Sequence, residues 1–67
     1  MSSNLTKDRD DALYRAAMAI EMRGARDHDG RPLAADELAA FEGYQTVARS
    51  HGFTDADIRR YQRTQLG

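Results

Sequence analysis

The chain has 67 residues, no cysteine, and ten basic against eleven acidic side chains, so its net charge is −1 at neutral pH. A chain of this length holds one small domain and has little room for the deep pocket of an enzyme. The lack of cysteine excludes a disulfide framework and any zinc site built on thiolates. No apolar run approaches the length of a signal peptide or a membrane span, so we expect a cytoplasmic protein without membrane contact.

Charge is unevenly spread along the chain. Residues 1–37 carry a net charge of −2 and residues 49–67 a net charge of +2. Nine of the ten basic residues are arginine, whose planar fork suits phosphate and guanine recognition. A GC-rich genome would also favour arginine and alanine, so composition alone does not choose between the two explanations.

The first predicted helix covers residues 6–24, after a flexible polar tail over residues 1–5. Leu13, Ala16, Ala17 and Ile20 recur at helical spacing and mark one buried stripe. Residues 6–67 should form a single domain.

Tyr14, Met18 and Met22 lie beside that stripe and widen the apolar face. Two alternatives remain open for these side chains: they pack under the second helix, or they stay exposed as a surface for a partner or a second copy. Methionine adapts to irregular partner surfaces and favours the second alternative.

Two glycines and the only proline interrupt the pattern over residues 24–35, which we expect to form a loop. A second helix is predicted over residues 35–50, with Leu38, Phe41, Tyr44 and Ala48 as its inner stripe. Gly43 falls in the middle of this helix, where it would allow close approach of the first helix or mark a kink.

A third helix is predicted directly after a tight turn. Gly52 can take the left-handed conformation that ends the second helix, and Thr54 with Asp57 forms a capping-box-like pair. Ile58 and Tyr61, with Gln65, define its inner face. β-Branched residues are too few for strands, so the sequence predicts an all-α fold: a small three-helix bundle with a helix-turn-helix-like corner.

The residues at this corner follow the pattern of residue types and spacing that is typical of helix-turn-helix DNA-binding motifs. Such motifs place a small residue where the two helices cross, a glycine in the turn and an apolar residue that fixes the second helix. Ala48, Gly52 and Ile58 occupy these positions at offsets 0, +4 and +10.

Residues 47–66, which read VARSHGFTDADIRRYQRTQL, resemble the opening helix-turn-helix of MerR-type regulators. The resemblance implies that the last helix enters the major groove of DNA. It also implies that Arg59, Arg60 and Arg63 contact phosphates or bases and that Thr54 contacts phosphate from the helix N-terminus. Gln62 completes the set of candidate DNA-binding residues.

This chain departs from the motif at the front of the helix. Asp57 replaces a hydroxyl residue on the DNA-facing side, and Asp55 adds a second carboxylate. Both would repel phosphate.

The segment between the first two helices also resembles a calcium-binding EF-hand loop, with Asp27, Asp29 and Gly30 followed by Glu37. Neither possible register supplies the oxygen ligands that such a loop needs. We therefore expect no metal and no cofactor. No nucleophile, general base or phosphate loop stands at a catalytic spacing, so we expect no enzyme.

Two functions from different classes remain. The first is a small DNA-binding protein of helix-turn-helix type, such as a regulator or a phage or plasmid accessory factor, with duplex DNA as its partner. The alternative is a small helical module that binds another protein, as an inhibitor, an adaptor or a minor subunit, with a homodimer as a further possibility.

Overall fold

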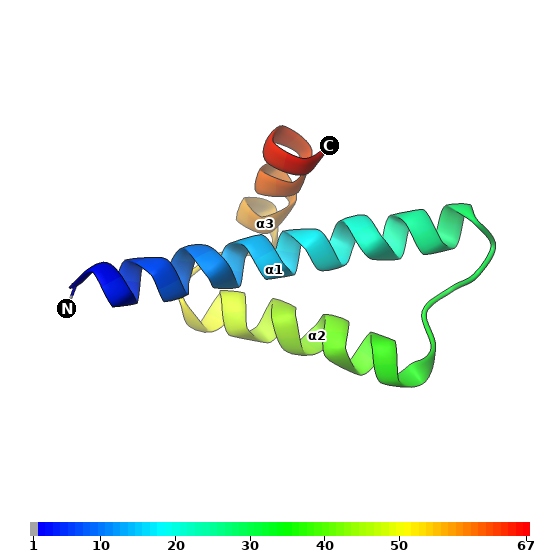
Figure 1. Cartoon of the computed structure of the whole chain (residues 1–67), viewed down its shortest axis with the longest axis horizontal. Helices are drawn as coiled ribbons and strands as arrows, with labels where there is room; N and C mark the ends of the chain where they lie inside the picture. Colours follow the sequence, from blue (N-terminus) through cyan, green and yellow to red (C-terminus); the bar gives the residue numbers. More distant parts are fainter. Residues whose placement is uncertain (1) are drawn as a thin grey trace.

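Two long helices run antiparallel and a short third helix stands across them (Figure 1). Helix α1 spans Ser2–His28, α2 spans Ala35–Ser50 and α3 spans Asp55–Tyr61, and a π-helical turn, η1 (Gln62–Leu66), follows α3 directly. The computed structural model describes residues 2–67, with side chains from Lys7 onward. Within that range the chain has three α-helices and no strand, which confirms the predicted all-α three-helix fold.

Helix α1 is longer than the expected 6–24, because Gly24 does not end it. Of the described glycines only Gly30 and Gly52 have a positive φ, so Gly24 keeps helical backbone. The last turn is held by Arg26, which pairs with Glu37 at the start of α2. The loop is correspondingly short and covers residues 29–34. Met1, part of the expected tail, lies outside the described residues, and the backbone is helical from Ser2.

The core lies where the three helices meet. Ala16 and Ala17 of α1, Ala48 of α2 and Ile58 of α3 are fully buried. Larger side chains, among them Leu13 and Ile20 of α1, pack around them. Ile58 is the only large side chain that is fully buried among those described, so α3 contributes the largest residue at the centre of the core.

The inner face of α2 differs from the expected stripe. Leu38 is 38% exposed and Tyr44 is 44% exposed, whereas Gln45 is only 6% exposed. The Gln45 amide donates a hydrogen bond of 2.9 Å to the carbonyl oxygen of Ala16 in α1, and this bond makes burial of a polar side chain tolerable. A Cβ at Gly43 would meet nothing within 4 Å, so of the two alternatives for this glycine, a close approach of α1 or a kink, the close approach is wrong.

The corner between α2 and α3 forms as predicted. Gly52 has a φ of 95° in the turn. The Thr54 hydroxyl accepts a bond of 3.1 Å from the backbone N–H of Asp57, and the Asp57 carboxylate accepts one of 3.0 Å from the N–H of Thr54. This capping box fixes where α3 begins and how it leaves the turn.

The π-helical turn after α3 changes which side chain faces the core. Leu66 is half-buried and packs against the core cluster, while Gln65 is exposed. The expectation that Gln65 lies on the inner face is therefore wrong. A π-helical turn winds fewer degrees per residue than an α-helix, so the inner position moves one residue along the chain.

Candidate functional site

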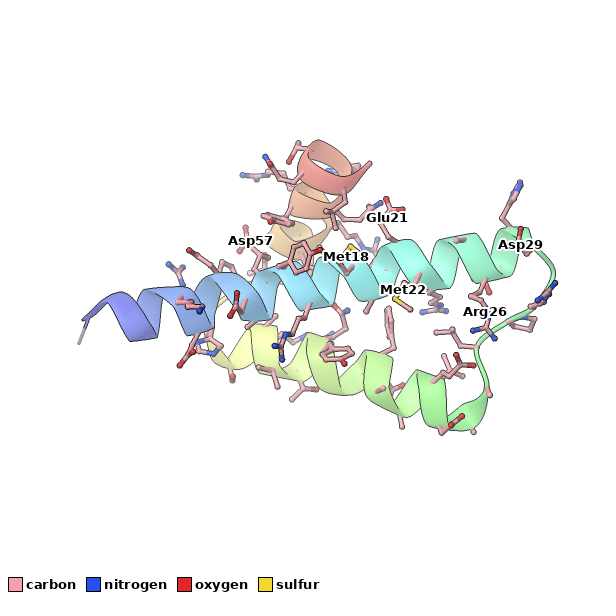
Figure 2. The ribbon with its side chains drawn as sticks, viewed as in Figure 1. Met18, Glu21, Met22, Arg26, Asp29 and Asp57 are labelled. Atoms are coloured by element: carbon pink, nitrogen blue, oxygen red, sulfur yellow. The ribbon has the colours of Figure 1, made fainter. Side chains whose placement is uncertain are left out.

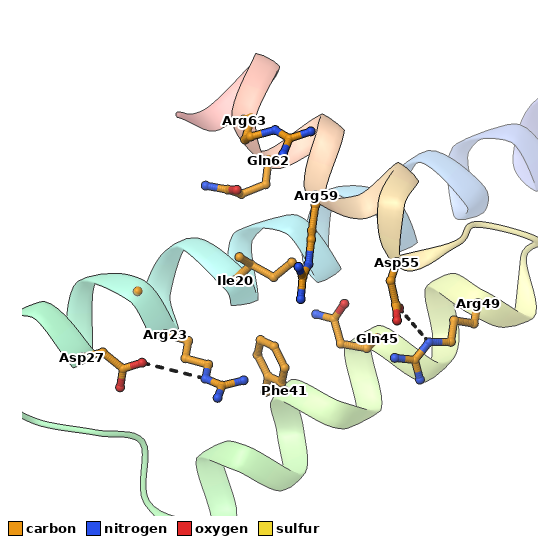
Figure 3. Close-up of a pocket in the computed structure, with 11 residues that line it drawn as sticks. Ile20, Arg23, Asp27, Phe41, Gln45, Arg49, Asp55, Arg59, Gln62 and Arg63 are labelled. Carbon is orange, nitrogen blue, oxygen red and sulfur yellow. Dashed lines mark hydrogen bonds and ion pairs between the residues drawn. The ribbon is translucent and has the colours of Figure 1, made fainter.

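Arginines from all three helices line one groove of about 500 Å³ beside α3. Arg23 comes from α1, Arg49 from α2, Arg59 from α3 and Arg63 from the π-helical turn. Figure 3 shows these side chains around the space between α1, α2 and α3. We call this feature the arginine groove.

Two aspartates neutralise part of the charge of the arginine groove. Asp27 lies 3.9 Å from Arg23, and Asp55 lies 3.0 Å from Arg49. Both ion pairs are about half exposed, so each stabilises the fold little. Arg59 and Arg63 make no ion pair with any carboxylate of residues 7–67. Four arginines against two aspartates leave the groove with a net charge of +2.

Phe41 supplies an aromatic surface within the arginine groove. The Arg23 guanidinium lies over the Phe41 ring, 5.1 Å from its centroid. The ring attracts the cation and helps to hold it beside the groove, where its Nε also pairs with Asp27. Arg59 enters from the opposite side and reaches toward Gln45, as Figure 3 shows.

The two carboxylates at the front of α3 are both engaged. Asp55 pairs with Arg49 of α2. The Asp57 carboxylate accepts one hydrogen bond within its own capping box, from the backbone N–H of Thr54, and this N–H and the Thr54 hydroxyl lower the pKa of that carboxyl. Each negative charge is therefore partly compensated by a donor on the protein, which reduces the repulsion expected from the sequence.

Of the other candidate DNA-binding residues, Gln62 also lines the arginine groove, whereas Arg60 and Thr54 lie outside it. Arg60 is exposed and lines a second hollow with Arg9, whose guanidinium lies 4.6 Å from the centroid of the Phe53 ring. The Gln62 amide donates a 2.6 Å hydrogen bond to the carboxylate of Glu21 in α1. Figure 2 shows Glu21 on the side of α1 next to α3. Gln62 thus ties the end of α3 to α1, and Thr54 serves as the helix cap.

The structure brings two arginines to the candidate site that sequence reasoning missed. Arg23 and Arg49 join Arg59 and Arg63 only because α3 folds back across α1. Arg49 lies within the motif and could have been included from its place in the last turn of α2. No local signal places Arg23 beside α3, since the two are brought together by packing between helices.

A second groove, mostly apolar, lies between α1 and α2. Its volume is about 380 Å³, and we call it the apolar groove. The predicted partner surface, Tyr14, Met18 and Met22, forms its α1 wall, and Phe41 and Tyr44 belong to its α2 wall. The remaining lining residues are Arg15, Ala19, Leu33, Glu37 and Ala40.

The apolar groove faces away from α3. Met22 lies half a turn round α1 from Leu13, the residue that packs toward α3. Residues 55–61 contribute no side chain to the groove. Tyr14 is 46% exposed and Met22 is 58% exposed, so two large apolar side chains of the α1 wall are about half open to solvent.

One ion pair closes the loop end of the apolar groove. Arg26 forms hydrogen bonds of 2.7 and 3.1 Å with the two carboxylate oxygens of Glu37. This pairing, with the N–H of Ala34, lowers the pKa of Glu37, and the same pairing raises the pKa of Arg26. Glu37 is therefore ionised at neutral pH and available to a further cation on its open side.

The residues of the EF-hand-like segment do not converge. Asp27 pairs with Arg23, and residues 7–67 contain no group of three histidine or carboxylate side chains placed to hold a metal ion. Within residues 2–67, none of the helices combines the length and apolarity that crossing a bilayer requires. No known protein family, no curated protein and no solved structure matches the chain.

Proposed function

We propose that the protein binds duplex DNA through α3 and the adjoining arginine groove, as a small non-enzymatic protein of helix-turn-helix type. The observation that carries the proposal is the convergence of Arg23 and Arg49 with Arg59 and Arg63 beside α3. Arginines from three separate segments gather on the side where a helix-turn-helix protein would meet its DNA.

The exposed side of α3 suits the major groove. Ala56 and Arg60 lie on the side of the helix opposite the buried Ile58, and both are exposed. Arg63, in the π-helical turn, is exposed beside the arginine groove. An α-helix with its side chains is about as wide as the major groove of B-DNA, roughly 12 Å. Arg60 and Arg63 would then reach phosphate oxygens or the acceptor edge of guanine.

The arginine groove would follow the phosphate backbone that borders the major groove. Arg59 and Arg63 are free of ion pairs within residues 7–67 and need not break one to bind phosphate. Arg49 would bind phosphate while Asp55 remains beside it, so its contribution to the binding free energy would be smaller. The protein as a whole carries a charge of −1, so attraction is local and the affinity should be micromolar and steeply salt-dependent.

Fluorescence anisotropy with a random-sequence duplex at two salt concentrations tests the proposal. With three to four phosphate contacts, the logarithm of the association constant should fall with the logarithm of salt with a slope of about −3. Arg59→Ala, Arg60→Ala and Arg63→Ala should each weaken binding and make the slope shallower by about one. The melting temperature should stay unchanged, since all three side chains are exposed.

Arg31→Ala is the matched control. Arg31 is an exposed arginine in the loop between α1 and α2, and Figure 1 shows this loop far from α3. Its replacement changes the net charge by the same amount as the replacement of Arg60. If Arg31→Ala weakens binding as much as Arg60→Ala, the attraction is unspecific and α3 is not the binding element. If the wild-type protein does not bind at low salt, the proposal is wrong.

The apolar groove favours the other hypothesis drawn from the sequence, a protein-binding module. Tyr14, Met22 and Tyr44 expose large apolar surfaces around a single hollow. Contiguous apolar surface of this kind typically marks a contact with another chain. The two functions use different faces, so one protein can carry both.

A further inference from the structure

We infer that the apolar groove is the interface of a homodimer, in which the α1–α2 pair of one copy packs on the α1–α2 pair of a second copy as a four-helix bundle. Three observations indicate that a second copy of the chain covers the groove: the width of the apolar face, the charges on its rim and the small size of the core. None of them depends on DNA binding.

The apolar face spans both helices. Tyr14 and Met22 stand on α1, and Tyr44 and Val47 stand on α2, each between 44 and 58% exposed. A single docked helix would fill the hollow between α1 and α2 but leave the outer sides of these residues in water. A second pair of helices covers both rows at once, which is how two helical hairpins form a four-helix bundle.

The area of this face is sufficient for a dimer. Helix α2 has 16 residues and is about 24 Å long, and two packed helices are about 20 Å wide. Such a face buries on the order of 500 Å² from each copy, or about 1,000 Å² in total, which is where specific interfaces begin. The dimer should therefore be reversible, with a dissociation constant in the micromolar range.

The rim charges are self-complementary. Arg15 lies at one end of the groove, and Glu37 lies at the other end beside Arg26. Eleven residues of α1 separate the two ends, which corresponds to about 16 Å. A two-fold axis through the middle, between Met18 and Met22, exchanges the ends and brings Arg15 of each copy to Glu37 of the other.

The free side of Glu37 suits this contact. Its carboxylate accepts two hydrogen bonds from Arg26 and one from the backbone N–H of Ala34, and Oε2, which accepts only one of the three, has a lone pair left for a second guanidinium. Arg15 is exposed and forms no ion pair with residues 7–67. The same axis sets Met18 of one copy near Met22 of the other, where the flexible thioether chains fill an irregular space.

The core of one copy is small, which favours association. Five apolar side chains are buried among those described, and four of them are alanine. Chains of this length commonly gain stability by oligomerisation because their own core is insufficient. Covering Tyr14, Met22 and Tyr44 would add three large side chains to the buried set.

Sedimentation equilibrium of the full chain, from low micromolar to millimolar concentration and without DNA, tests the inference. We expect a monomer–dimer equilibrium. Met22→Glu should raise the dissociation constant at least about 100-fold, since the symmetry places two charges in the interface. Arg15→Glu should raise it about tenfold, and Arg15→Lys, which keeps the charge, should change it little.

Leu38→Glu is the matched control, because Leu38 is an exposed apolar residue of α2 outside the groove. It should dimerise as the wild type does, and circular dichroism should show unchanged helix content in every variant. A wild-type protein that stays monomeric at millimolar concentration overturns the inference. So does a dimer that Met22→Glu leaves intact, because its interface must lie elsewhere. Arg59→Ala should dimerise normally, which separates this outcome from a failure of DNA binding.

Discussion

Replacement of Ile58 tests the account of the core most directly. Ile58→Ala removes three carbon atoms from the only large side chain that is fully buried among those described. Transfer alone contributes about 0.8 kcal/mol per buried methylene, or about 2.4 kcal/mol for three, and the cavity raises the loss to about 3–4 kcal/mol. A domain of 67 residues typically has a free energy of unfolding of only about 3–10 kcal/mol.

The expected change in melting temperature follows from this loss. For a domain of this size, 1 kcal/mol corresponds to roughly 4–8 °C, so a loss of about 3–4 kcal/mol in Ile58→Ala should lower the melting temperature by about 12–32 °C or leave the chain largely unfolded. Ile58→Val should lower it by about 4–8 °C.

Leu38→Ala is the control, because it removes the same number of carbon atoms from a side chain that is 38% exposed. It should lower the free energy of unfolding by only about 1.5 kcal/mol. Thermal melts followed by circular dichroism at one protein concentration compare the three variants. A melting temperature of Ile58→Ala equal to that of Leu38→Ala would refute the reasoning, because it would mean that α3 is not anchored through this side chain.

Three further predictions concern single contacts. Gly43→Ala should raise the free energy of unfolding by about 0.8 kcal/mol, whereas Gly52→Ala should lower it by about 1–2 kcal/mol. An added Cβ meets nothing within 4 Å at either site, so urea unfolding of the two variants isolates the cost of the φ of 95° at Gly52, and equal effects would contradict it. Thr54→Ala should lower the free energy of unfolding by about 1 kcal/mol through loss of the α3 cap, and a melt like the wild type would show that the cap does not stabilise α3. The pKa of Glu37 is lowered from its ordinary value of 4.5, so the pair with Arg26 stabilises the fold above that pH and loses its effect as the pH falls through the lowered pKa. Thermal melts from neutral pH to pH 3 should therefore show a smaller fall in melting temperature for Glu37→Gln than for the wild type. If the melting temperatures of the two proteins fall equally, the pair contributes nothing to stability.

Local signals predicted the parts of the fold that local chemistry determines. The bounds of α2, the left-handed Gly52 and the capping box of Thr54 and Asp57 all follow from residues within a few positions of one another. Helix α1 passes through Gly24 because its last turn is held by an ion pair with Glu37, eleven residues further along the chain from Arg26. A contact of that kind has no local signature.

The burial of Gln45 shows the same limit in the core. Apolar periodicity places Tyr44 inside and Gln45 outside, but the carbonyl oxygen of Ala16 satisfies the amide, and α2 rotates accordingly. The candidate site was predictable only in its α3 half. Arg23 joins it through the path of the chain, which the sequence pattern does not contain.

The placement of the two grooves on different sides of the α1–α2 pair has a consequence for how a dimer would meet DNA. Packing through the apolar groove sends the two α3 helices outward, away from one another. Helix-turn-helix dimers that read a palindrome instead hold both recognition helices on one side, about 34 Å apart, so that they enter successive major grooves. A dimer with α3 on opposite outer sides would engage two separate duplexes. The expected product is a bridge between DNA segments, visible as condensation or looping of long DNA.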